Sequence, residues 1–264
     1  MGKPKPSIRR LLVLDRVFPD RNPSLRFTIS LVGIGGTGSH LLERLARIHM
    51  ALCELGKPGL LVLAHDPDQI DPHTPIRQHF RLADIGQNKA HAAIARINGQ
   101  YGLDWVACDF LFDEKSLENE GPFNVNMVIT CVDQGHIRNV LHKHRPSGRD
   151  NFKVHASAKR LGLWMDVGND KHHGQVVLTD WRLPTIVNHN GLYDTVIPEG
   201  SCSLAASLRT QDLLVNDHAA MHAAQMLWEL LNEGSIGYHA VWFNLQKGIV
   251  QRSLIEKLQH KTSR

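Results

Sequence analysis

Residues 26–39 read Arg-Phe-Thr-Ile-Ser-Leu-Val-Gly-Ile-Gly-Gly-Thr-Gly-Ser, and this stretch decides the fold. The short apolar run over 26–32 is partly β-branched and predicts a buried strand. An amphipathic helix is predicted directly after the glycines, because apolar residues recur at helical spacing. They are Leu41, Leu42, Leu45, Ile48 and Leu52. A strand, a GxGxxG loop and a helix in this order are typical of nucleotide-binding βαβ units.

The glycine loop predicts a phosphate site. Gly33, Gly35 and Gly38 allow a tight turn and a close approach that a Cβ would block. The helix that follows would bring backbone N–H groups and a positive partial charge to the phosphate. Dehydrogenases, methyltransferases and adenylating enzymes share this motif, so it does not name the reaction. The alternative is a tight turn that binds no ligand.

Further strands and helices alternate along the chain, which predicts parallel βαβ units with right-handed crossovers. Strands are expected at 60–64, 105–108, 125–131 and around 152–156, and helices at about 87–98 and 135–144. The expected fold class is α/β: a Rossmann-like mixed sheet with mostly parallel strands, helices on both faces and a C-terminal antiparallel extension.

The pattern changes after residue 160. Segments 163–167 and 174–178 predict a hairpin or neighbouring strands, and 183–205 predict an excursion over the sheet. A long helix is expected over 211–231, and 238–255 predict a closing pair of strands that turns at Lys247-Gly248. We interpret 1–264 as a single domain, with a nucleotide-binding core at about 26–160 and an extension at about 161–264.

Composition excludes several classes of protein. The net charge of +4 is too small and dispersed to indicate nucleic acid, and no apolar run is long enough to span a membrane. The four cysteines form no CxxC pair, which argues against structural zinc and against a secreted disulfide framework. We therefore expect a cytoplasmic protein, with Cys53 and Cys108 in its core.

Polar residues follow the predicted strands where a nucleotide would lie. Asp66 ends the second strand, the position from which a carboxylate accepts ribose hydroxyls in Rossmann folds. Arg77 and Lys89 then place two cations near the phosphates. Attack of a carboxylate on the α-phosphorus of ATP needs such cations, and nicotinamide binding does not. Asp133 ends the fourth strand, where a carboxylate suits Mg²⁺.

Several motifs together resemble the ThiF/MoeB branch of the ubiquitin-activating superfamily. Residues 66–78 (DPDQIDPHTPIRQ) resemble its D-x-D…N-x-x-R-Q segment at unchanged spacing. Residues 86–89 (GQNK) resemble its G-x-x-K, 131–133 (CVD) its C-x-D, and 33–39 its G-x-G-G-x-G-S loop. A narrower resemblance, to ThiF-related proteins of bacterial PRTRC cassettes, rests on 164–170 (WMDVGND) and 174–177 (GQVV).

The resemblance implies an enzyme that uses ATP and Mg²⁺ to adenylate a carboxylate and releases pyrophosphate. The implied substrate is the C-terminal glycine of a small ubiquitin-like or sulfur-carrier protein, and the implied assembly is a homodimer. It places Asp66 on the ribose, Arg77 and Lys89 on the phosphates and Asp133 on Mg²⁺. It also assigns further residues to the nucleotide site, namely Gly36, Asp68 and Gln78.

Three departures from the family pattern stand out. Thr74 and Gln134 occupy positions where the family usually has Asn, and the paired CxxC zinc site of many members is absent. Cys202 lies in a chain region where relatives often carry a reactive thiol. We interpret it as the acceptor of the activated acyl group, acting as a thiolate; an inert thiol or a substrate contact are the alternatives.

Two other functions stay open at this point. An NAD-dependent oxidoreductase would use the same glycine loop but leaves Arg77 and Lys89 unexplained. A non-catalytic nucleotide-binding scaffold of a mobile-element cassette is the third possibility, and Thr74 and the missing zinc site favour it.

Overall fold

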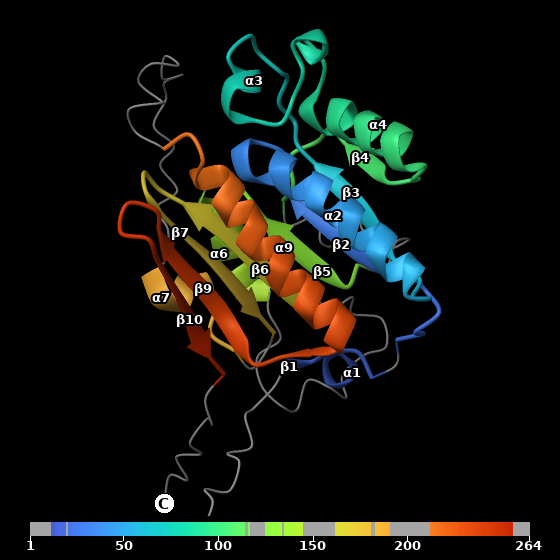
Figure 1. The fold of residues 1–264 in the computed structure, drawn as a ribbon, viewed down its shortest axis with the longest axis vertical. Coiled ribbons are helices and arrows are strands. Elements are labelled where there is room, and N and C mark those ends of the chain that lie inside the picture. Colours follow the sequence, from blue (N-terminus) through green and yellow to red (C-terminus); the bar gives the residue numbers. More distant parts are fainter. Residues whose placement is uncertain are drawn as a thin grey trace, which may run out of the picture.

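The computed structural model describes residues 12–19, 21–113, 116, 125–133, 135–144, 162–180, 183–190 and 212–255. These residues form a mixed eight-stranded sheet in the order β10-β9-β7-β6-β5-β2-β3-β4 (Figure 1). The parallel strands are β2 (Phe27–Val32), β3 (Leu60–His65), β4 (Val106–Cys108), β5 (Met127–Thr130) and β6 (Leu163–Asn169). The antiparallel extension adds β7 (His173–Thr179), β9 (Tyr238–Asn244) and β10 (Ile249–Leu254).

The central strands are buried on both faces, as expected for a parallel sheet between two helical layers. All six residues of β2 are buried, and so are all four of β5. Strand β6 pairs parallel with β5 and antiparallel with β7, so the direction of pairing changes at this strand. Because β2 pairs parallel with both β3 and β5, the carboxyl ends of these three strands meet at one edge. This is the edge at which open α/β sheets bind ligands.

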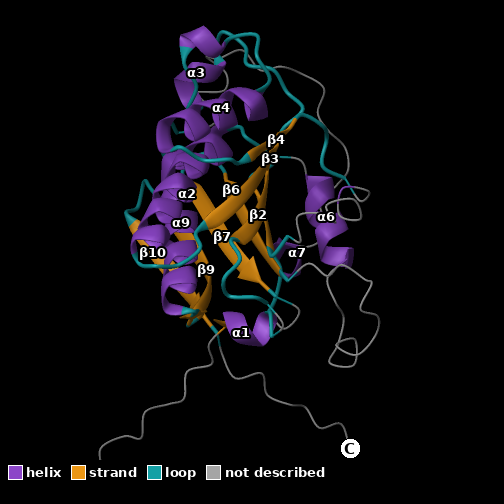
Figure 2. Cartoon of the chain, turned by 90° about the vertical axis from the view of Figure 1, so that its right-hand side faces the viewer, coloured by secondary structure: helices purple, strands orange, loops and turns teal. Residues whose placement is uncertain are grey.

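Helices cover both faces of the sheet (Figure 2). Helices α2 (Gly36–Glu54) and α9 (Val215–Glu233) pack against each other on one face, and α4 (Lys89–Tyr101) packs against α2. The other face carries α6 (Gly135–His144) and α7 (Ile186–Asn190). Alternate strand residues divide between the two cores: Ile29 and Ile129 face α2 and α9, whereas Val128 and Trp164 pack with Ile137 of α6.

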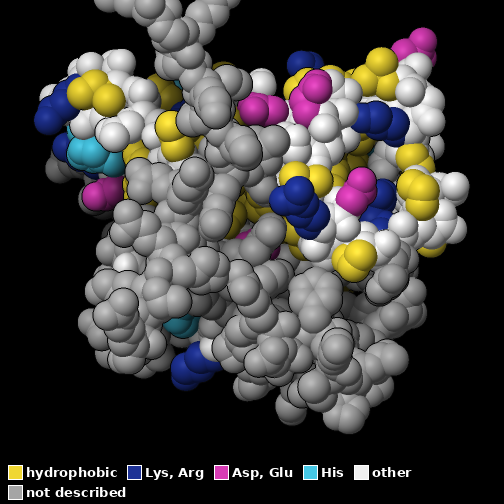
Figure 3. All heavy atoms as spheres, turned by 90° about the horizontal axis from the view of Figure 1, so that it is seen from below, with side chains coloured by type: hydrophobic (Ala, Val, Ile, Leu, Met, Phe, Trp, Pro, Cys, Tyr) yellow, Lys and Arg dark blue, Asp and Glu magenta, His cyan; other side chains and the backbone are white. Residues whose placement is uncertain are grey.

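Short elements complete the fold. Strand β1 (Leu12–Val13) pairs with β8 (Ser235–Ile236) beside α1 (Leu14–Val17). Helix α3 (Thr74–Arg77) and a 3₁₀ turn (Leu82–Asp84) lie in the connection between β3 and α4. Seen from below in Figure 3, the described side chains mix basic, acidic and hydrophobic types, and neither sign of charge dominates among them.

The predicted fold class is confirmed: a mostly parallel Rossmann-like sheet with helices on both faces and antiparallel strands at its C-terminal side. The long C-terminal helix begins at Val215 instead of 211, and the connection over 66–80 contains α3. The strand expected at 152–156 lies outside the described residues, as does the predicted excursion from residue 191 onward. Whether 1–264 is one domain stays a prediction.

The predictions that Cys53 and Cys108 lie in the core have different outcomes. Cys108 is buried as predicted, but the prediction for Cys53 was wrong, because it lies exposed near the end of α2.

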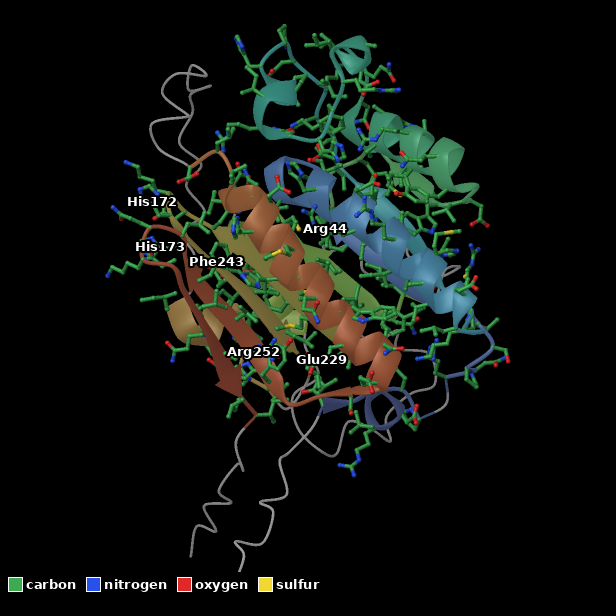
Figure 4. The ribbon with its side chains drawn as sticks, viewed as in Figure 1. Arg44, His172, His173, Glu229, Phe243 and Arg252 are labelled. Atoms are coloured by element: carbon green, nitrogen blue, oxygen red, sulfur yellow. The ribbon has the colours of Figure 1, made fainter. Side chains whose placement is uncertain are left out.

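In the turn between β6 and β7, His172 is half-buried beside Asp212, and His173 begins β7 (Figure 4). Among the described helices, none is long and apolar enough to cross a membrane.

Candidate nucleotide site

A cavity of about 1060 Å³ opens at the carboxyl ends of β2, β3 and β5. It brings together most residues that the sequence analysis placed in the site. They are Gly33, Gly35, Gly36, Asp66, Asp68, Arg77, Gln78, Lys89 and Asp133. Gly38 is not part of the cavity wall, and Cys202 lies outside the described residues.

The glycine loop joins β2 to α2 and has two kinds of glycine. Gly33 and Gly38 are needed for close packing of the loop. Gly33 has φ +88°, and a Cβ on Gly38 would lie only 1.8 Å from the Gly33 carbonyl oxygen. Around Gly35, by contrast, a Cβ would meet nothing within 4 Å. Helix α2 begins without a side-chain cap, which suits an anion at its N-terminus.

Asp66 supports the glycine loop as well as facing the cavity. Its carboxylate accepts hydrogen bonds from the backbone N–H of Ile34 at 2.6 Å and of Asp68 at 2.9 Å. Burial raises the pKa of Asp66, whereas nearby Lys89 and these two N–H groups oppose that rise. The sequence analysis assigned this carboxylate to a ribose and missed its contact with the loop.

Lys89 is the first residue of α4 and is nearly buried. Asn88 caps the helix by accepting a hydrogen bond from the N–H of His91, which fixes the helix start next to β3. Lys89 Nζ donates to Asp68 Oδ2 at 2.9 Å. The Lys89 side chain is 11% exposed and that of Asp68 is 65% exposed, so the ammonium group sits deeper in the wall than its partner.

Arg77 ends α3, Gln78 follows it, and both face the same cavity. Burial lowers the pKa of Arg77 below its usual value. Gln78 Oε1 is buried and has no hydrogen-bond partner among the described residues. The segment is held against α2, because the backbone N–H of His79 donates to Ser39 Oγ at 2.9 Å. A buried acceptor without a donor is a group that a bound ligand can satisfy.

Thr74, which replaces the family's Asn, is engaged within its own turn. Its Oγ1 donates to Asp71 Oδ1 at 3.0 Å and accepts from the Asp71 N–H at 3.1 Å. The residue is 5% exposed and lines the cavity. The hydroxyl therefore stabilises the turn that precedes Arg77.

Asp133 lies exposed at the cavity, and a buried ion pair holds the backbone next to it. Arg138 of α6 donates through Nη2 to the Val132 carbonyl at 2.8 Å and through Nε to Asp166 Oδ1 at 2.6 Å. Thr130 Oγ1 also donates to Asp166 Oδ1, at 2.8 Å. Sequence reasoning missed Arg138; its signal was a cation between Ile137 and Leu141 on the apolar face of a predicted helix.

Among the described residues, no group of three or more His, Cys, Asp or Glu side chains could hold a metal ion. Mg²⁺ does not require such a group, since it often binds one or two carboxylates together with substrate phosphates. The exposed carboxylate of Asp133 fits that arrangement, with the remaining ligands coming from a nucleotide.

A glycine loop at a helix N-terminus, a carboxylate after β3 and two cations around one cavity form the kind of site at which Rossmann-like folds bind nucleotides. Residues 12–146 match the model of the ThiF family, and the chain belongs to this family.

Sequence relatives are ubiquitin-like modifier-activating enzymes. The chain is 29% identical over 149 residues to ubiquitin-like modifier-activating enzyme 5 of Oryza sativa subsp. japonica, covering 51% of this chain and 33% of that protein. It is 26% identical over 257 residues to the enzyme of the same name from Gallus gallus, covering 87% and 57%. The chain thus spans a third to somewhat over half of these curated relatives.

Solved structures share the fold. E. coli MccB with selenomethionine MccA aligns with a TM-score of 0.60 and 14% identity, covering 90% of this chain and 66% of that one. E. coli MccB with ATP aligns with a TM-score of 0.55 and 14% identity, covering 88% and 64%. At this identity the likeness establishes architecture only.

Proposed function

We propose that the chain is an adenylyltransferase that uses ATP to activate a carboxylate and releases pyrophosphate. The observation that carries the proposal is that Arg77 and Lys89 line the same cavity as the glycine loop. A phosphate at the start of α2 would therefore lie between the helix N-terminus and two cations. Such pre-arranged positive charge stabilises the charge that develops during phosphoryl chemistry.

The reaction needs positioning and neutralisation more than acid–base chemistry. A carboxylate oxygen of the substrate attacks the α-phosphorus, and a new O–P bond forms. The bond from the α-phosphorus to the bridging oxygen breaks, and pyrophosphate leaves with the electron pair. Arg77 and Lys89 would neutralise the leaving pyrophosphate, Asp66 would hold the ribose, and Gly36, Asp68 and Gln78 would complete the nucleotide site.

Mg²⁺ belongs to the same proposal. Asp133 would hold it together with the phosphates, and the ion would offset their negative charge. Arg138 would keep this carboxylate in place through the neighbouring Val132 carbonyl. Because one carboxylate binds Mg²⁺ weakly, the ion is expected to enter with ATP.

The proposed substrate is the C-terminal glycine of a small ubiquitin-like or sulfur-carrier protein. Its support comes from relatives named ubiquitin-like modifier-activating enzymes and from MccB solved with MccA. A homodimer, a cytoplasmic location and membership of the PRTRC-cassette subgroup are narrower parts of the proposal. Light scattering in solution would test the dimer, and a monomeric mass would reject it.

Cys202 is proposed as an acyl acceptor after adenylation, on its sequence position alone. A thioester-linked product that forms undiminished on Cys202→Ala would reject this role.

Two rival functions predict different ligands. An NAD-dependent oxidoreductase should bind NAD in preference to ATP, and a non-catalytic scaffold should bind nucleotide without releasing pyrophosphate. The polar cavity wall around Arg77 and Lys89 favours a triphosphate over a nicotinamide ring. The oxidoreductase does not account for these two cations, whereas the scaffold differs from the proposed enzyme in releasing no pyrophosphate.

ATP–pyrophosphate exchange with candidate small proteins encoded nearby tests the proposal. Arg77→Ala, Lys89→Ala and Asp133→Ala are each expected to lower exchange by about 100-fold or more, the scale seen when one charge-stabilising group is lost. Arg47→Ala and Lys247→Ala are matched controls, because both side chains are exposed and lie outside the cavity. Exchange that survives in the three cavity variants would contradict the proposal.

A further inference from the structure

The first turn of α9 reaches the glycine loop through Asn216. This residue is 4% exposed and lines the cavity. Its Oδ1 accepts hydrogen bonds from Thr37 Oγ1 and from Asn169 Nδ2, both at 3.1 Å. Figure 1 and Figure 2 show α2 and α9 side by side; the bond from Thr37 joins their N-terminal ends, and the bond from Asn169 joins α9 to the end of β6.

The Asn216 amide belongs to a hydrogen-bond network with Thr37 and Asn169. Thr37 Oγ1 accepts a hydrogen bond from Asn169 Nδ2 at 2.8 Å, so its own proton is available to donate to Asn216. In this network the amide oxygen of Asn216 faces Thr37 and Asn169, and the nitrogen faces away from them. A Cβ built on Gly36 would lie 2.6 Å from that nitrogen, so it sits directly against the loop.

The burial of the Asn216 amide nitrogen, Nδ2, is not compensated by a hydrogen bond to the described residues. An unsatisfied buried donor destabilises a fold, and such groups in native proteins call for an explanation. Here the donor adjoins Gly36, at the loop and helix end where a phosphate would bind.

We propose that Asn216 is a nucleotide-binding residue, whose Nδ2 donates a hydrogen bond to a phosphate oxygen of the ligand held by the glycine loop. The inference rests on the proposed function, because that function supplies the nucleotide. It adds a residue of α9 to a site whose other proposed ligand-binding residues lie between Gly33 and Asp133.

The variant Asn216→Asp tests the donor specifically. Aspartate keeps the shape and the oxygen that Thr37 and Asn169 contact, but replaces the donor with a second carboxylate oxygen. Folding should be preserved, because a carboxylate is favourable in the first turn of a helix. In calorimetric titrations the Kd for ATP should rise by about 100-fold or more, since a donor becomes a charge that repels phosphate. The Kd for adenosine should stay within about twofold, because adenosine has no phosphate.

A second variant and a control separate binding from positioning. Asn216→Ala should weaken ATP binding about tenfold, the effect of one lost hydrogen bond to a charged group. Asp217→Asn changes the next residue, which accepts from Arg44 Nη2 at 2.7 Å outside the cavity, and should leave both affinities within about twofold. Arg44 lies between α2 and α9 in Figure 4.

The possible failures can be told apart. If the wild-type chain binds ATP and Asn216→Asp binds it as tightly, the inference is wrong and the proposed function stands. If the variant loses ATP and adenosine to the same degree, Asn216 only positions the loop, which also overturns it. If the wild type binds no nucleotide, the proposed function fails first.

Discussion

At the scale of single residues, side chains that face the cavity also hold its wall together. Asp66 accepts two backbone N–H groups of the loops around it, and Asn216 accepts from Thr37. Changes at such positions would alter stability and ligand binding together. The glycines of the loop differ from these side chains. Gly38 is required for packing, whereas the space beside Gly35 is open.

Gly38→Ala should destabilise the protein by about 3 kcal/mol or more, because a Cβ 1.8 Å from the Gly33 carbonyl oxygen cannot be accommodated without moving backbone. Gly35→Ala is the matched control, since its Cβ would meet nothing within 4 Å, and the free energy of unfolding should change by less than about 1 kcal/mol. Urea denaturation measures both. Equal stability of the two variants would show that Gly38 is not a packing residue.

At the scale of elements, the segment that carries Arg77 is held on the first turn of α2. The rings of His40 and His79 stack with their centroids 5.5 Å apart, and the Arg96 guanidinium donates to the His79 carbonyl at 2.5 Å. Asp217 of α9 faces His40 at 3.4 Å. Any force that separates these two rings would also move the cationic segment.

This contact should make stability depend on pH. Burial lowers the pKa of both His40 and His79 below the usual value near 6.5. Arg44 and Arg96 add to this lowering for His40, and Arg96 does so for His79, whereas Asp217 opposes it for both rings and Glu43 for His79. The unfolded chain therefore binds more protons between the lowered pKa values and about 6.5, and stability falls as the pH drops through that window.

Urea denaturation at pH 7.5 and 5.5 tests the sign. The free energy of unfolding should fall at the lower pH, and the fall should be smaller in His40→Gln/His79→Gln. His222, whose pKa burial also lowers, remains in both proteins and sets the background. An unchanged pH dependence in the double variant would rule out this pair as its source.

At the scale of the whole molecule, the part after residue 160 completes both the sheet and the cavity wall. Strand β6 lies between β5 and β7, and α9 buries Ala219, Ala223 and Leu227 against the core that also contains Leu41 of α2. Asp166 of β6 pairs with Arg138 of α6. The boundary near residue 160 thus divides a contiguous core.

A chain that ends at residue 160 should therefore fail to fold cooperatively, because the apolar face of α2 and one side of β5 would be exposed to water. Circular dichroism and urea denaturation of fragment 1–160 check this. Co-expression with 161–264 should restore a cooperative transition. Cooperative unfolding of 1–160 alone would instead make it an independent domain.

Much of the fold was predictable because its signals are local. Buried runs end at glycines or prolines, and helical periodicity follows each of them, so β2, α2, β3 and α4 were placed within a few residues. The helix start at Val215 was misplaced by a few residues, because Leu213 and Leu214 fit an apolar helical pattern but lie exposed in a turn before the helix. Cys53 was misplaced, because an apolar residue near a helix end need not face the core.

The sequence by itself determined the glycine turn, the strand that precedes Asp66 and the two cationic positions at 77 and 89, since short-range spacing and backbone geometry encode them. Only the tertiary structure brought Asn216 to Thr37, 179 positions away, and Arg138 to Asp166. Such contacts depend on strand order and on how α9 packs across α2. Local periodicity carries no information about which distant elements become neighbours.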